Sequence, residues 1–340
     1  MKQYYPAYYN AFRCIAADCP DSCCQGWDVA IDSDTERFYR TVDGEFGEKL
    51  RGAIYTDGDG DRVFRLKDKK KCPFWGEDKL CDIYRTLGEE HLCATCAQFP
   101  RIRMEYADFC EHSLALACPE AARLILKTDN AYSSLTQESS ACCEDYDAKL
   151  MHTLLKARQK LAESLLTKRP LAERLQSCLS ITAQVQEEIE PLHNACDVPY
   201  TPDALAALFT QLEYIDERNG EIIVQACRSA DFSNQESELT RLALYYLYRY
   251  WLNAVDTRNV FAVFTHMIVS ASVISNLSRM NRLTLIEAAQ RYSKEVEQSY
   301  ENLERLFDTF AYESCFHPGN MINLILRQGV NHALSHPFSQ

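Results

Sequence analysis

The chain has 340 residues, of which 46% are hydrophobic, and its formal net charge is −13. This length suits about two domains with ordinary cores. The acidic charge argues against a nucleic-acid partner, because phosphate binding needs a basic surface and the short basic run 67–71 is typical of a solvated turn. The amino terminus has no apolar run of signal-peptide length, and no stretch of about 18 uninterrupted apolar residues occurs. We therefore expect a cytoplasmic protein without a membrane partner.

The first third of the chain has little helical periodicity and several turn signals. The sequence TDGDGD separates two strand-like pieces, 54–55 and 63–66, and predicts a hairpin. The segment 83–99 has a helical pattern that ends before a proline, which cannot continue a helix. Pro119 suits the first turn of a further helix over 120–126. This region is therefore predicted to consist of short elements.

After residue 140 the pattern becomes almost wholly helical, with leucines recurring at helical spacing. Thr201 before Pro202 marks one helix start, and Thr284 with Glu287 matches a capping box. Polar residues interrupt the apolar segment 260–274, which predicts a buried helix rather than a membrane span.

The cysteines divide the chain into two parts. Ten of the 16 lie in the first 118 residues, and the stretch 128–140 that follows is polar. We therefore place a domain boundary near residue 130. The predicted fold class is mainly α: a cysteine-rich metal or iron–sulfur domain over 1–130 with a small β-hairpin, followed by an all-helical domain over 131–340.

The clustered cysteines indicate a soft metal centre rather than disulfides, which a reducing compartment does not favour. Histidine is scarce nearby, so an all-thiolate site is the economical reading, either an iron–sulfur cluster or a zinc held by four thiolates. The plainer alternative is buried structural thiols. We set aside Cys93, three positions from Cys96 on a predicted helix, and Cys110, in an apolar context. Eight remain, enough for one centre with spares or for two: Cys14, Cys19, Cys23, Cys24, Cys72, Cys81, Cys96 and Cys118.

The other six cysteines have no partner at ligand spacing, and we expect them to be packing thiols. They are Cys142, Cys143, Cys178, Cys196, Cys227 and Cys315.

Three runs in the first part resemble the flagellin lysine N-methylase family: FRCIAADCPDSCCQGWDVAID, CPFWGEDKLCDIYRTLGEEHLCATCAQFPR and EHSLALACPEAARLIL. The same region is similar to the widespread zinc- or iron-chelating cysteine-cluster domain. YYLYRYW and YSKEVEQSYENLERLF resemble the family's carboxy-terminal segments. By this resemblance, the eight cysteines named above correspond to the family's cysteines. The residue pairs at 26–27 and 100–101 and the segment 111–113 also match the family's pattern. It implies Arg101 and Glu111 as cofactor-binding residues.

This resemblance implies transfer of a methyl group from S-adenosylmethionine to lysine side chains of flagellin or another lysine-bearing protein. It also implies a cysteine-bound cluster, of the 4Fe–4S type, with zinc as the alternative. A neutral amine can displace the sulfonium methyl directly once the lysine has lost its proton, so nitrogen methylation needs no radical. The cysteine spacing also departs from the radical S-adenosylmethionine motif of three cysteines separated by three and then two residues.

Two other functions are compatible with the same cysteines. One is a non-enzymatic metal- or cluster-binding scaffold. The other is a radical or redox enzyme that uses the cluster for electron transfer. No glycine-rich dinucleotide turn is present, so the motifs leave the cofactor pocket and the catalytic residues unassigned.

Other residues have a functional and a plainer interpretation. The tyrosines at 245, 246, 248 and 250 could hold an alkylammonium by cation–π contact, but such a dense aromatic helix is more often core packing. Glu295 and Glu297 could orient the substrate amine, but we expect them to be solvated. Arg101 could clamp a carboxylate such as that of the methionine moiety, or form a structural salt bridge.

Overall fold

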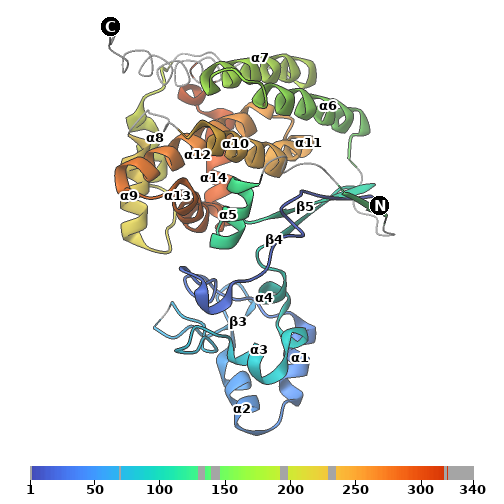
Figure 1. Ribbon diagram of the computed structural model, residues 1–340, viewed down its shortest axis with the longest axis vertical. Coiled ribbons are helices and arrows are strands. Elements are labelled where there is room, and N and C mark those ends of the chain that lie inside the picture. The colour runs from blue at the N-terminus through green and yellow to red at the C-terminus, as the bar shows by residue number, and fades with distance from the viewer. Residues whose placement is uncertain are drawn as a thin grey trace.

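The computed structural model describes residues 2–68, 70–128, 135–138, 146–191, 198–228, 235–317 and 320. Figure 1 shows two lobes, one below the other. We call residues 13–99 the small lobe and the other described residues the large lobe. The chain begins in the large lobe, passes through the small lobe and then returns to build the helices drawn from green to red.

The small lobe consists of short elements. Strands β2 (Ile54–Thr56) and β3 (Arg62–Phe64) pair antiparallel, which confirms the predicted hairpin. The Asp57 carboxylate accepts the backbone N–H groups of residues 59 and 61 and closes the turn. The helices are α1 (Ser33–Thr41), α2 (Gly44–Ala53), α3 (Asp82–Leu87) and α4 (Ala94–Gln98), with 3-10 turns at Ala16–Asp18 and Glu89–His91.

The prediction of one helix over 83–99 is wrong. Gly88 has a φ of +100°, which no helix accommodates, and it ends α3. A 3-10 turn follows before α4 begins, where the Asp32 carboxylate accepts the N–H of Ala94 at 2.8 Å. Cys81 therefore caps α3, while Cys93 caps α4 and Cys96 lies within it, rather than all three lying along one helix.

The large lobe contains a four-stranded sheet that the sequence analysis did not predict. Its order is β4-β5-β1-β6, with β1 parallel to β5 and antiparallel to β6. The first strand, KQYY, is too short to give a periodic signal, and its partners lie more than a hundred residues away in sequence. The strands are β1 (Lys2–Tyr5), β4 (Arg101–Glu105), β5 (Phe109–Leu114) and β6 (Leu135–Glu138).

Helices make up most of the large lobe and begin where the sequence signals them. Pro119 opens α5, Thr201 caps α8 ahead of a proline, and Thr284 with Glu287 forms the predicted capping box of α13. The helices are α5 (Pro119–Lys127), α6 (Ala148–Leu165), α7 (Leu171–Ile189), α8 (Pro202–Phe209), α9 (Glu217–Cys227), α10 (Glu236–Tyr250), α11 (Ala254–Thr257), α12 (Val260–Asn281), α13 (Leu285–Tyr292) and α14 (Tyr300–Tyr312). A π-helical turn covers Ser293–Glu297, and 3-10 turns cover Trp251–Asn253 and Ser314–Phe316.

The chain is thus mainly helical, as predicted, but it has a small sheet besides the predicted hairpin, and strand β6 lies in the part that was predicted to be all-helical. Its buried hydrophobic residues form two clusters, one in each lobe. The larger includes Tyr8 and Phe12 from the start of the chain as well as the helices, and the smaller spans Val29 to Cys93. The domain boundary near residue 130 stays a prediction.

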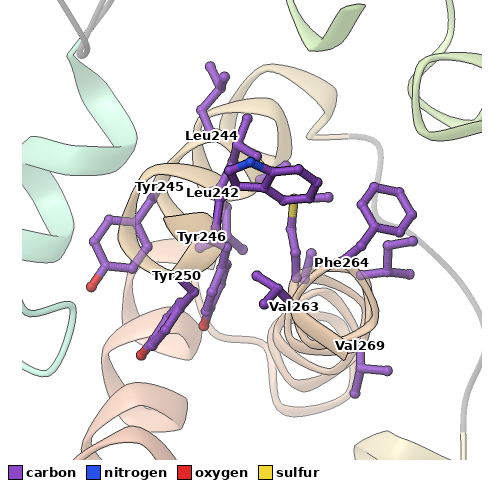
Figure 2. Close-up of a cluster of buried hydrophobic side chains, with 14 of the residues drawn as sticks. Leu242, Leu244, Tyr245, Tyr246, Tyr250, Val263, Phe264 and Val269 are labelled. Atoms are coloured by element: carbon purple, nitrogen blue, oxygen red, sulfur yellow. The ribbon is translucent and has the colours of Figure 1, made fainter. Parts of the chain in front are cut away.

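Helix α12 runs through the larger core. It is long and apolar enough to cross a membrane, but 94% of its most apolar window is buried inside the protein. This agrees with the predicted buried helix. Figure 2 shows Val263 of α12 facing the tyrosine-bearing helix α10.

Candidate active site between the lobes

The cysteines of the first 118 residues are free thiols, and nine of them form two groups. We call Cys14, Cys19, Cys23 and Cys118 the loop thiols, and Cys24, Cys72, Cys81, Cys93 and Cys96 the core thiols. The tenth, Cys110, is fully buried on β5.

The loop thiols bring together two segments that lie about a hundred residues apart. Burial, with smaller contributions from the neighbouring Cys19 and Cys14, raises the pKa of Cys118 to about 11. A hydrogen bond to Cys24 and burial raise the pKa of Cys23, and Cys14 and Cys118 again add to the rise. Cys118 directly precedes α5, so the start of this helix adjoins the cysteine-bearing loop 14–27 of the small lobe.

The core thiols lie around the hydrophobic core of the small lobe. The Cys72 N–H donates to the Cys24 carbonyl at 2.9 Å. Burial raises the pKa of Cys72 to about 12, and the thiols of Cys24, Cys81 and Cys93 add to this. Cys93 is 1% exposed and hydrogen-bonds Cys96, which lowers the pKa of Cys93. The structure therefore places Cys93, which the sequence analysis set aside, among the predicted ligands.

The chemistry of these donors fits a thiolate-bound metal or cluster. The thiols lie close enough to perturb one another's pKa values. The pKa values of Cys24 and Cys93 are lowered, toward the thiolate form that binds metal, by hydrogen bonds from neighbouring thiols. Burial raises those of Cys19, Cys72, Cys81 and Cys118. Within the described residues, however, no three His, Cys, Asp or Glu side chains are arranged to hold one metal ion. The predicted ligand cysteines therefore lie in the same region, but they do not surround a single point.

The other six cysteines were predicted to be packing thiols. Cys178 and Cys227 are fully buried in the large core, and Cys315 packs against it, which confirms the prediction for these three. Cys142, Cys143 and Cys196 lie outside the described residues.

A cleft of about 640 Å³ lies between the lobes. The small lobe contributes part of the cysteine loop, from Ile15 to Gly26, and Lys70. The large lobe contributes the start of α5, the turn 215–219 and residues between 284 and 295. The turn 215–219, which we call the 215–219 loop, includes the first residues of α9. The cleft thus combines the segment that carries the loop thiols with three segments of the helical lobe.

A buried ion pair joins the two lobes at this cleft. The Nζ atom of Lys294 lies 2.7 Å from Oδ1 of Asp21, and the Lys294 side chain is only 9% exposed. The same ammonium lies 5.2 Å from the centre of the Trp27 ring, a cation–π contact. Because Asp21 lies between Cys19 and Cys23, this pair fixes the middle of the cysteine loop against the helical lobe.

The expectation that Glu295 and Glu297 are solvated is wrong. Both are buried, at 3% and 8% exposure, because the π-helical turn directs them into the protein. Glu297 accepts a hydrogen bond from the Tyr250 hydroxyl at 3.3 Å, and burial raises the pKa of its carboxyl. Glu295 lines the cleft.

The structure does not bring Arg101 and Glu111 together. They lie three residue pairs apart in the β4–β5 register, with Arg101 opposite Leu114 and Glu111 opposite Met104. The Arg101 guanidinium lies over the Phe12 ring at 5.3 Å. Glu111 borders a second, smaller pocket of about 340 Å³ and not the cleft. A cofactor-binding role for either residue stays a prediction.

The tyrosines of α10 belong mainly to the core. Tyr245, Tyr246 and Tyr250 are between 0% and 4% exposed. Figure 2 shows their hydroxyl ends pointing away from Leu244, with the rings of Tyr246 and Tyr250 side by side. Tyr248 is partly buried in the second pocket, and the Arg158 guanidinium lies 4.7 Å from its ring. Core packing is therefore the better interpretation for the first three.

Comparison with known proteins decides the family. The profile of the FliB lysine N-methylase C-terminal domain matches residues 120–324, more than half of the chain. The chain belongs to the FliB lysine N-methylase family. It is therefore a member of a methyltransferase family, in agreement with the resemblance seen in the sequence.

Individual relatives of this FliB family member come from Salmonella. The chain is 31% identical over 139 residues to the flagellar biosynthetic protein FliU of Salmonella muenchen, covering 37% of this chain and 78% of that protein. It is 32% identical over 139 residues to a Lysine-N-methylase of Salmonella choleraesuis (strain SC-B67), and 33% identical over 134 residues to one of Salmonella typhimurium (strain LT2). Each of these two matches covers 37% of this chain and a third of the relative. No solved structure matches the chain.

Sequence reasoning missed Asp21, Gln290 and Lys294 as residues of this FliB-family cleft. Asp21 lay inside a recognised cysteine motif, and Lys294 lay inside the family-like run YSKEVEQSYENLERLF. Neither stood out, because an aspartate and a lysine 273 positions apart give no pairing signal in a single sequence. The family domain supplies one wall of the cleft from residue 120 onward, and the cysteine loop outside it supplies the other.

Proposed function

We propose that this chain transfers methyl groups from S-adenosylmethionine to lysine side chains of flagellin or another lysine-bearing protein, at the cleft between the lobes. The observation that carries this proposal is the composition of the cleft, with one wall from the FliB-family domain and the other from the cysteine loop. The names of the Salmonella lysine N-methylases support the reaction class. FliU, named as a flagellar biosynthetic protein, supports a flagellar substrate.

The cleft has a size and lining that suit this chemistry. Its volume of about 640 Å³ lies in the range of cofactor and small-molecule sites. Ile15, Ile215 and Ile286 supply apolar surface, which disfavours the charged form of a lysine amine as it enters. Carboxylates such as Asp216 also line the cleft and attract the incoming ammonium.

The proposed step is a direct displacement. The lysine nitrogen, once deprotonated, forms a bond to the methyl carbon while the bond from that carbon to sulfur breaks. S-adenosylhomocysteine leaves, and the proton lost from the nitrogen passes to solvent or to a base. In this step the chain's residues align the two reactants and exclude water, which alone lowers the barrier substantially.

A cysteine-bound iron–sulfur cluster of the 4Fe–4S type, with zinc as the alternative, is the second part of the proposal. The eight predicted ligand cysteines and Cys93 offer enough thiolates for it. When bound, an iron–sulfur cluster supplies redox-active iron, and zinc supplies a Lewis acid. A reducing cytoplasm keeps these thiols available, so we place the protein there, without a membrane or nucleic-acid partner.

One preparation tests both parts. Protein purified without oxygen is analysed for iron, sulfide and zinc, then incubated with S-adenosylmethionine and flagellin, and methylated lysines are counted by mass spectrometry. We expect iron with sulfide, and lysine methylation that continues without a reductant. Methylation that requires a reductant would favour a redox enzyme. Metal without methylation or S-adenosylmethionine binding would favour a scaffold, and absence of metal would refute the cluster.

A further inference from the structure

The π-helical turn Ser293–Glu297 borders the cleft with two consecutive residues, Lys294 and Glu295. Such turns are rare and occur frequently at functional sites. Both side chains are buried, and Lys294 contacts the small lobe whereas Glu295 contacts another segment of the large lobe. The turn therefore connects to both sides of the proposed reaction site.

Lys294 reaches the wall that carries the cysteines. Its ammonium forms the ion pair with one oxygen of Asp21. Gln290, one helical turn earlier, donates to the other Asp21 oxygen at 2.7 Å. Gln290 also donates to the carbonyl of Ala117 at 3.0 Å. Because Asp21 precedes Cys23 and Ala117 precedes Cys118, these contacts hold the two segments of the loop thiols side by side.

The backbone of the cysteine loop approaches the helical lobe very closely at Gly26. This residue has a φ of +105°, and a Cβ atom there would lie 2.9 Å from Ile215 and 3.4 Å from Lys294. Only glycine fits this position without strain. The contact shows that the loop, Lys294 and the 215–219 loop meet at one place.

Glu295 holds a segment of the helical lobe that lines the cleft. One oxygen of its carboxylate accepts the backbone N–H groups of Ile215 at 2.8 Å and Asp216 at 3.1 Å. The other accepts the Asn219 side-chain amide at 2.7 Å. Three hydrogen bonds to one buried carboxylate fix the loop 215–219, because each charge-assisted bond is stronger than a neutral one.

We propose that Lys294 and Glu295 are positioning residues for methyl transfer. Lys294 holds the cysteine loop of the small lobe and Glu295 holds the 215–219 loop of the large lobe, so that one helical turn fixes these two parts of the cleft lining relative to each other. Neither residue needs to touch the reacting atoms. This inference rests on the proposed function, because it assigns the residues that shape the proposed site.

The test compares Lys294→Met and Lys294→Arg with the unchanged protein, prepared without oxygen. We expect Lys294→Met to lower kcat/KM for flagellin methylation by about 100-fold, as small misplacements of reactants do. We also expect faster alkylation of Cys19 and Cys23, mapped by mass spectrometry, with Cys178 and Cys227 unchanged. Lys294→Arg keeps the charge, so we expect it to keep most of the methylation activity and the slow alkylation of Cys19 and Cys23. The matched control is Lys49→Met, which removes a surface ion pair with Asp82 and should change neither.

A second pair of variants keeps the test decisive if Lys294→Met does not fold. Asp21→Asn weakens the same ion pair from the loop side and should give the same alkylation pattern. Glu295→Gln keeps the side-chain shape and should lower kcat/KM by about tenfold, since it weakens three hydrogen bonds. Rates and alkylation like those of the unchanged protein in these folded variants would overturn the proposal. If the unchanged protein shows no methyl transfer, the proposed function fails, while alkylation still reports whether Lys294 holds the loop.

Discussion

Glu111→Ala should lower the free energy of unfolding by about 3 to 5 kcal/mol, because it leaves a buried arginine without its counter-charge. The Arg158 side chain is 8% exposed, and both of its terminal nitrogens bond the Glu111 carboxylate, one at 2.7 Å. Tyr248 covers the other side of the guanidinium and offers no compensating charge. Denaturant unfolding of the variant and the unchanged protein measures the loss.

The matched control is the exposed ion pair of Asp34 with Arg37, where Asp34→Ala should give no measurable change. A double variant, Glu111→Leu with Arg158→Met, should recover much of the lost stability, because an apolar pair can replace a buried ion pair. A loss under about 1 kcal/mol in Glu111→Ala would contradict the assignment of this pair as a buried, mutually dependent one.

The second large effect is a dependence of stability on pH that comes from His266. This side chain is 1% exposed, and neither ring nitrogen has a hydrogen-bond partner among the described residues. Burial, with a smaller contribution from the charge of Arg249, lowers the pKa of His266 to about 3. In the unfolded chain the pKa is about 6.5. Between these values the unfolded state binds the extra proton, so stability falls as the pH falls.

The slope from this one group is about 1.4 kcal/mol per pH unit below pH 6.5. His266→Phe keeps an aromatic ring among Tyr250 and Phe307 and removes the titration. Unfolding free energies measured at pH 7, 6 and 5 should therefore decline less steeply in the variant. The raised pKa of the Glu297 carboxyl lowers the stability as the pH rises, opposite to the effect of His266. This contribution is the same in the variant and in the unchanged protein. Parallel curves would show that His266 does not carry the effect.

Local signals predicted the hairpin and the starts of several helices. The capping box at Thr284, the proline starts of α5 and α8 and the TDGDGD turn act within a few residues, so a single sequence contains them. The long-range features could not be found in this way. The sheet joins β1 to β5 across about a hundred residues, and no periodicity records such a pairing.

In the candidate site, too, the local motifs could be predicted from the sequence and the long-range contacts could not. The cysteine motifs pointed to a region that forms one side of the cleft, because four thiols within eleven residues are chemically conspicuous. Cys93 was set aside because of its spacing from Cys96 on one helix, and the structure does place both at α4 but with Cys93 buried beside the core thiols. Glu295 was expected to be solvated because the π-helical turn that buries it has no sequence signal. The Asp21–Lys294 pair depends wholly on how the two lobes meet.

The central claim is that the cleft between the lobes binds the methyl donor. Hydrogen–deuterium exchange with and without S-adenosylmethionine tests it directly. We predict slower exchange in the segments that line the cleft: 15–26, 119–123, 215–219 and 284–295. Slower exchange confined to 109–113 and 155–159, which border the second pocket, would contradict the claim and place the donor beside Glu111 instead.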